Sequence, residues 1–93
     1  MRILICDDEV RYIQPLRKCL EQYMAEHNIP SEITETVAPQ KILLSKEVYD
    51  IAFLDIQMEN VDGLTLAKEL RQRNRKTALF FITNYEGYQD NAM

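Results

Sequence analysis

The sequence of 93 residues is poor in the cysteines, glycines, prolines and long apolar runs that are typical of disulfide scaffolds, linkers and membrane spans. It has two cysteines without the spacing of a metal site, two glycines and three prolines. No apolar run approaches the roughly 20 residues that cross a bilayer, and charged residues interrupt the N-terminus at once. We therefore expect no membrane segment and no signal peptide. Cys6 and Cys19 are interpreted as reduced residues that pack in the fold, which favours the cytoplasm.

The composition predicts one globular domain without a basic surface overall. Hydrophobic residues make up 46 % of the chain, which is typical of a packed core, and the length leaves no room for a second domain. The net charge of −4 argues against nucleic-acid binding by the domain as a whole. A local basic cluster (Arg71, Arg73, Arg75 and Lys76) is interpreted as the C-terminus of a helix, where cations suit the helix dipole.

Three short apolar runs each end in a residue that phosphoryl chemistry uses. The run ILIC at residues 3–6 leads into Asp7 and Asp8, IAFL at 51–54 leads into Asp55, and ALFFI at 78–82 leads into Thr83. Runs of this length indicate buried parallel strands, and a helical pattern follows each of them. Ligands of open parallel sheets bind beyond the carboxyl ends of the strands. The three strand ends are therefore expected to form one acidic pocket.

The remaining segments complete an alternation of strands and helices. A helix is expected to begin near Tyr12, since this start places Pro15 close to the first turn. Its inward face would carry Val10, Ile13, Leu16, Leu20 and Met24, joined by Cys19 and Tyr23. Residues 33–37 read as a polar edge strand, 39–46 as a short helix and 49–54 as a strand. A helix with Leu64, Ala67 and Leu70 inside follows, then a strand over 77–82 and the start of a fourth helix.

This alternation predicts an α/β fold, a doubly wound parallel sheet with right-handed crossovers. Because residues 33–37 are polar, we place that strand at an edge, which gives the strand order 2-1-3-4. The first, third and fourth strands are expected to be buried on both faces. The order reverses between the first and third strands, and Asp7, Asp8 and Asp55 are predicted to flank that reversal.

Three neighbouring carboxylates need protons or a cation, since each pair repels by roughly 4 kcal/mol at 4 Å and moderate dielectric. Hard oxygen ligands suit Mg²⁺. Asp8 and Asp55 are predicted as direct ligands and Asp7 as a ligand through water, with the backbone carbonyl of Gln57 completing the set. A carboxylate beside the metal can also attack phosphorus and form an aspartyl phosphate. The Thr83 hydroxyl would then donate to a phosphoryl oxygen and act as a sensor.

Each residue also has a plainer interpretation. Asp7 and Asp8 suit a helix N-cap, Asp55 suits a turn, and threonine is common at strand ends. Their joint occurrence at three strand ends of one sheet favours the phosphoryl site.

These motifs strongly resemble the receiver domain of two-component response regulators. The resemblance rests on ILICDDE at residues 3–9, DIAFLDIQM at 50–58 with DGL at 62–64, and FIT at 81–83. It implies a flavodoxin-like (CheY-like) fold and Mg²⁺-dependent transfer of phosphate from a sensor histidine kinase to the phosphoacceptor Asp55. Asp7 and Asp8 correspond to the acidic pair at the metal, and Thr83 to the switch hydroxyl. Residues 82–88 look closest to receivers that carry a LytTR-type DNA-binding output domain, which implies transcription regulation.

The chain also departs from the family pattern. Receivers have a fifth strand that ends in a lysine and then a fifth helix, whereas this sequence stops at Met93. Residues 1–93 are therefore expected to be a receiver domain without strand 5 and helix 5. The fourth strand would become an apolar edge, and we expect self-association through it and the helix 4 region.

Two other functions remain open at this point. One is a receiver-like interaction domain that does not respond to phosphate, which the missing lysine favours. The other is a phosphohydrolase resembling the haloacid dehalogenase family, but those enzymes need a second aspartate where this chain has Gln57. We expect a phosphoacceptor rather than a turnover enzyme.

Overall fold

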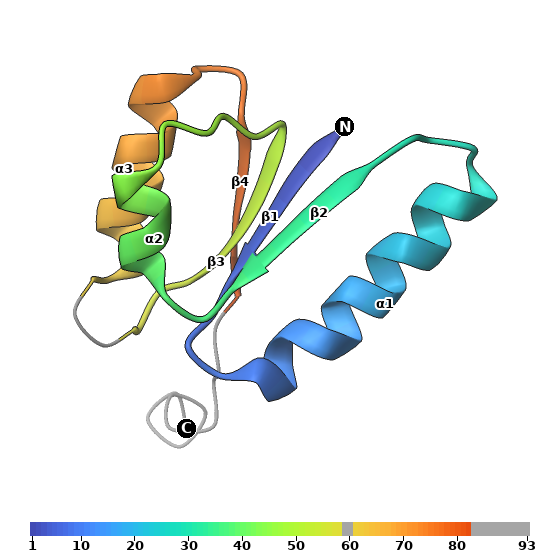
Figure 1. The fold of residues 1–93 in the computed structure, drawn as a ribbon, viewed down its shortest axis with the longest axis horizontal. Helices are drawn as coiled ribbons and strands as arrows, with labels where there is room; N and C mark the ends of the chain where they lie inside the picture. Colours follow the sequence, from blue (N-terminus) through green and yellow to red (C-terminus); the bar gives the residue numbers. More distant parts are fainter. Residues whose placement is uncertain (59–60, 83–93) are drawn as a thin grey trace, which may run out of the picture.

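A computed structural model describes residues 1–58 and 61–82 of the chain. Strands and helices alternate along it in the order β1 (Arg2–Cys6), α1 (Val10–Glu26), β2 (Glu32–Thr36), α2 (Pro39–Leu44), β3 (Ile51–Asp55), α3 (Gly63–Arg73) and β4 (Ala78–Ile82). The strands form one parallel sheet in the order β2-β1-β3-β4, which confirms the predicted order. Figure 1 shows α2 and α3 together on one side of the sheet and α1 on the other, as a doubly wound fold requires.

The larger part of the core lies between the sheet and the pair α2 and α3. Alternate residues of β1 and β3 point to this side, and the inward face of α3 meets them. The buried members are Leu4, Cys6, Ile42, Tyr49, Ala52, Leu54, Leu66, Ala67 and Leu70. Leu64, which the sequence pattern placed inside, is 51 % exposed, because the helix turns it away from the sheet while Leu66 faces inward.

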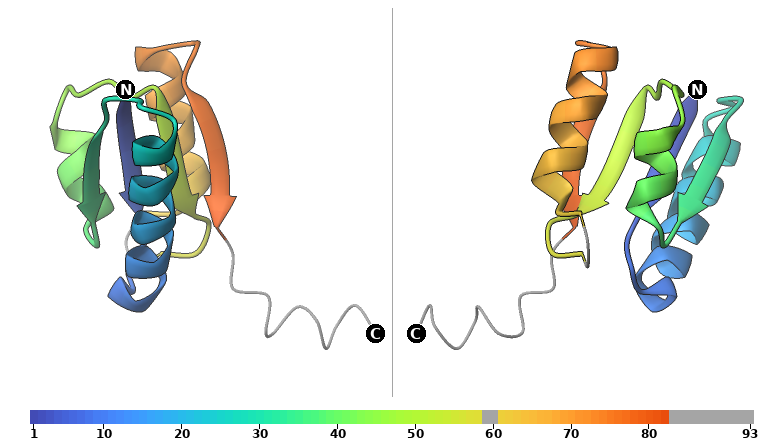
Figure 2. Two further views of the ribbon diagram at one scale, coloured as in Figure 1. Left: turned by 90° about the vertical axis from the view of Figure 1, so that its right-hand side faces the viewer. Right: turned by 60° about the vertical axis from the view of Figure 1, so that its left-hand side comes forward.

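Helix α1 packs on the opposite face through a narrower stripe than the sequence predicts. Ile13 and Met24 are buried against the sheet, whereas Val10 and Tyr23 are more than half exposed. Cys19 is also exposed, so the expectation that it packs in the fold is wrong. Figure 2 shows the reason, since α1 lies over β1 and β2 while β4 forms the far edge of the sheet. A helix that touches only this part of the sheet buries only a narrow face.

The start of α1 also differs from the prediction. The helix begins at Val10, two residues before the expected Tyr12, so that Pro15 lies inside it. A proline in this position lacks the N–H that would bond one turn back, which removes one hydrogen bond from the helix. Pro15 is exposed, so its ring meets solvent and not the sheet.

The two edges of the sheet have different surfaces. The polar strand β2 is held by α1, since Gln14 and Arg17 donate to the Glu35 carboxylate at 3.0 and 2.7 Å. On β4, Phe80 and Phe81 are 51 % and 42 % exposed. The predicted two-sided burial of this strand is therefore absent from the part of the chain that the structure describes. Within that part, no helix combines the length and apolarity needed to cross a membrane.

Candidate functional site

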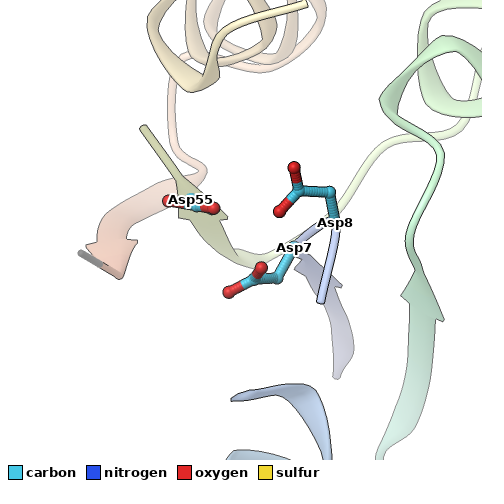
Figure 3. Close-up of side chains that lie close together, drawn as sticks. All are labelled: Asp7, Asp8 and Asp55. Atoms are coloured by element: carbon cyan, nitrogen blue, oxygen red, sulfur yellow. The ribbon is translucent and has the colours of Figure 1, made fainter. Parts of the chain in front are cut away.

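The ends of β1 and β3 bring three carboxylates together. Cys6 of β1 lies in register with Leu54 of β3, so the residues that follow each of them emerge side by side. One carboxylate oxygen from each of Asp7, Asp8 and Asp55 lies within 4.8 Å of the others. Figure 3 shows these side chains gathered in front of the strand ends. The adjacency that the strand order predicts is thus present in the structure.

The three acids differ in how they are held. Asp7 is 2 % exposed, and its backbone N–H donates to the Thr36 carbonyl of β2 at 3.2 Å. Its side chain accepts from the backbone N–H of Glu9 at 3.0 Å, which fixes the turn into α1. Asp55 is half-buried and Asp8 is exposed. The site is therefore closed at Asp7 and open to solvent at Asp8.

The electrostatics of the cluster favour a proton or a cation. Burial raises the pKa of Asp7 to about 6, and repulsion from Asp55 and Asp8 adds to this, against the hydrogen bond from Glu9. Burial also raises the pKa of Asp55, and the charge of Asp8 adds to this, while the Gln57 N–H and a hydrogen bond with Asp7 oppose it. A cluster of oxygen donors in which burial and like charge raise the pKa of two carboxylates fits a hard divalent cation such as Mg²⁺.

Of the two other predicted site residues, the structure describes Gln57 but not Thr83. Gln57 follows the site, and its backbone N–H donates to Asp55 Oδ1 at 3.2 Å, which orients the carboxylate. Its assignment as a carbonyl ligand stays a prediction. Thr83 lies outside the described residues, although Ile82 before it is in register with Asp55.

Beneath the site, a sulfur pair joins the two strand ends. The Cys6 thiol lies 3.8 Å from the Met58 thioether, which ties the segment after Asp55 to β1. Burial, together with the charges of Asp7 and Asp55, raises the pKa of Cys6 to about 12. The thiol is therefore protonated at neutral pH, and its role here is packing.

Two residues that shape the site, Asp62 and Gly63, belong to the motif DGL, but no role was assigned to them from the sequence. Asp62 caps α3 by accepting from the Thr65 N–H at 2.7 Å. Gly63 is buried, and its N–H donates to the Ile56 carbonyl at 2.9 Å, which places the start of α3 against the end of β3. An aspartate followed by a glycine before an apolar helical pattern was the available signal, and it indicates an N-cap more than a contact with Asp55.

Residues 3–93 match the family of the response regulator receiver domain. The chain belongs to this family. The acidic cluster therefore lies in a receiver domain of two-component response regulators, a class of signalling proteins.

Among characterised proteins, the chain is 32 % identical over 88 residues to the sensory transduction protein LytR of Streptococcus agalactiae. It is also 32 % identical over 84 residues to the transcriptional regulatory protein RprY of Bacteroides fragilis. These matches cover 95 % and 89 % of the chain, but only 36 % and 34 % of the two relatives. The receiver thus spans about a third of these relatives' length.

Solved structures agree with the fold. The response regulator TrrA from Thermotoga maritima, solved in complex with Mg²⁺-BeF, has 28 % identity and a TM-score of 0.64. The match covers 97 % of this chain and 75 % of TrrA. The BeF3-activated receiver domain of DrrB has a TM-score of 0.75 over 88 % of this chain and 64 % of its own, and its 15 % identity bears on the fold alone.

Proposed function

We propose that Asp55 is the phosphoacceptor of this receiver domain. The observation that carries the proposal is the juxtaposition of Asp55 with Asp7 and Asp8 at the carboxyl edge of the sheet. Asp55 is half-buried and is oriented by the Gln57 N–H, so one face of its carboxylate is held while the cluster opens to solvent at Asp8. Such an arrangement suits a nucleophile that receives a group from outside.

We assign the metal site to the same cluster. Asp8 and Asp55 would hold Mg²⁺ directly, Asp7 through water, and the Gln57 carbonyl would complete the set. Burial raises the pKa of both Asp7 and Asp55, and the charge of the neighbouring acids adds to this, which supports a cation there. The complex of the related TrrA with Mg²⁺-BeF supports the same assignment.

In this proposal a carboxylate oxygen of Asp55 attacks the phosphorus of a phosphohistidine on a sensor histidine kinase. The new bond joins Asp55 Oδ to phosphorus, the phosphorus–nitrogen bond breaks, and the imidazole of the kinase leaves with the electron pair. Bound Mg²⁺ supplies neutralisation of the phosphoryl oxygens. The Gln57 N–H keeps Asp55 in place, and the Thr83 hydroxyl reports the phosphoryl group as a switch. Asp55 acts as a stoichiometric acceptor and not as a turnover catalyst.

The whole protein is proposed to convert this phosphorylation into transcription regulation in the cytoplasm. The relatives named as a sensory transduction protein and a transcriptional regulatory protein support an output domain that binds DNA, as the LytTR-like motif suggests. The receiver carries a net charge of −4, so DNA contact belongs to that output domain.

Self-association through β4 and the expected helix 4 region, which lies outside the described residues, is part of the proposal for the 93-residue chain. Phe80 and Phe81 expose apolar surface on this strand, and such edges invite pairing with a second copy. Light scattering at high micromolar concentration tests this, and a monomer would contradict it.

The test of the central proposal is phosphorylation by acetyl phosphate, read by intact mass with and without Mg²⁺. The unmodified chain should gain one phosphate only with Mg²⁺, and Asp55→Ala should gain none. Asp62→Asn is a matched control, because it alters another aspartate near Asp55 but keeps an oxygen that can cap α3. Without any phosphate on the unmodified chain, an interaction domain independent of phosphorylation becomes the better description.

A further inference from the structure

Gly63 occupies a place in which the structure leaves no room for a side chain. A Cβ atom built on it would lie 2.9 Å from the carbonyl carbon of Asp55 and 3.0 Å from Ile56 Cα, and closer still to the carbonyl oxygen of Asp55. All three are backbone atoms, so no side-chain rotation relieves the overlap. Gly63 has no positive φ, so glycine is required here by space and not by backbone conformation.

We propose that Gly63 is a positioning residue that sets where β3 places the Asp55 carboxylate relative to Asp7 and Asp8. Ordinary carbon contacts begin near 3.4 Å, so any side chain at this position must separate the start of α3 from the end of β3. In a close-packed interior, that separation moves backbone by an amount on the order of 1 Å. The Asp55 side chain moves with its backbone, whereas Asp7 and Asp8 are held by the end of β1.

The effect would come from crowding and not from a weaker helix. Alanine favours helices more than glycine does, and the N-cap of α3 does not depend on Gly63. Asp62 Oδ1 accepts from the Thr65 N–H at 2.7 Å, a bond in which Gly63 takes no part. Replacing Gly63 by alanine therefore leaves α3 capped and changes its distance from Asp55.

The consequence for ligand binding rests on the proposed function of the acidic cluster. Mg²⁺ demands near-ideal octahedral geometry, with ligand distances of about 2.0–2.1 Å. A displacement of one carboxylate on the order of 1 Å is large on that scale. We expect Gly63→Ala to weaken Mg²⁺ binding at least tenfold.

The first measurement uses the metal-free protein and follows the backbone amide resonances of Ile56 and Gln57 by NMR. Gly63→Ala should shift both, because the Gln57 N–H donates to Asp55 Oδ1 and Ile56 lies against the new methyl group. The matched control is Leu70→Val, a buried change two turns further along the same helix that lowers stability without approaching Asp55. It should leave the two resonances and the Mg²⁺ affinity unchanged.

Unmoved Ile56 and Gln57 resonances in a folded Gly63→Ala protein would overturn the proposal, whatever happens to Mg²⁺ binding. If the unmodified protein binds no Mg²⁺, the metal assignment fails, while the resonances still decide the role of Gly63. Should Gly63→Ala not fold, the comparison is made in the Asp7→Asn background, where carboxylate repulsion is relieved. There the same two resonances should shift between the single and the double variant.

Discussion

The charged side chains at the two ends of the sheet are arranged in opposite ways. At the carboxyl end, Asp7, Asp8 and Asp55 face one another, and the pKa of both Asp7 and Asp55 is raised. At the amino end, the Arg2 guanidinium pairs with the carboxylates of Glu32 and Glu47, and the Arg2 backbone N–H donates to Asp50 at 2.7 Å. The same chain thus pairs its charges at one end and concentrates like charges at the other.

The amino end is also joined across the sheet. The Asp50 N–H donates to the Arg2 carbonyl at 2.8 Å, and the Asp50 carbonyl accepts from the Ala78 N–H at 2.9 Å. The buried Thr77 hydroxyl donates to the Tyr49 carbonyl at 2.6 Å. These bonds hold the starts of β1, β3 and β4 in register. The bonds at the amino end therefore help to offset the cost of gathering like charges at the carboxyl end.

The largest stability effect is expected from Arg73, at the amino end. Its side chain is 12 % exposed and donates to the Glu69 carboxylate at 2.8 Å and to the carbonyls of Ile42 and Leu43 at 3.1 and 3.2 Å, which ties α3 to the end of α2. Charge-assisted bonds of this kind are strong, so Arg73→Met should lower the free energy of unfolding by about 2–3 kcal/mol.

Urea unfolding checks this value, with Arg75→Met as the control because Arg75 is exposed beyond the end of α3. The control should change the free energy of unfolding by less than about 0.5 kcal/mol. Equal losses in the two variants would contradict the stabilising role of the bonds that Arg73 makes to α2 and Glu69.

The next effect has the opposite sign and belongs to the carboxyl end. Asp7→Asn should stabilise the metal-free domain at pH 7 by an amount on the order of 2 kcal/mol, because it removes a buried charge that two carboxylates repel. The asparagine oxygen can still accept from the Glu9 N–H. The same variant should lose Mg²⁺-dependent stabilisation, which thermal unfolding with and without Mg²⁺ measures.

The pH dependence follows from the pKa of Asp7, about 6 in the folded state against about 3.9 in the unfolded chain. Between these values the folded state binds more protons, so the stability of the metal-free protein falls as pH rises through this window. The difference from Asp7→Asn should therefore vanish below about pH 4 and be complete above about pH 6. Asp62→Asn is the control, since the pKa of that exposed N-cap is lowered and its contribution is lost as pH falls. A pH-independent gain from Asp7→Asn would contradict the electrostatic explanation.

The smallest effect is expected from a surface ion pair at the amino end. Arg2 bonds the Glu47 carboxylate, but the Glu47 side chain is 50 % exposed and solvent screens the pair. Glu47→Gln should lower the free energy of unfolding by no more than about 0.5 kcal/mol, read by urea unfolding in the same series. A loss as large as that of Arg73→Met would show that exposed charges matter more at this end than their burial implies.

Much of the fold could be predicted because strand order follows from residue pattern. The polar residues of β2 indicate an edge, and the apolar runs before Asp7 and Asp55 indicate central strands. The order β2-β1-β3-β4 could therefore be predicted from the sequence. The burial of individual helix residues could not be predicted in this way. Val10, Tyr23 and Leu64 have helical spacing, yet they are exposed, because periodicity does not tell how much of a helix the sheet covers.

The candidate site divides in the same way. Residue type and position at the strand ends were enough to bring Asp7, Asp8 and Asp55 together, since parallel strands place their carboxyl ends at one edge. The degree of burial of Asp7, the sulfur contact between Cys6 and Met58 and the crowding at Gly63 depend on distances between segments far apart in the chain. Those distances arise only when the strands and helices pack together, because local pattern sets which residues share an edge while packing sets how closely they meet.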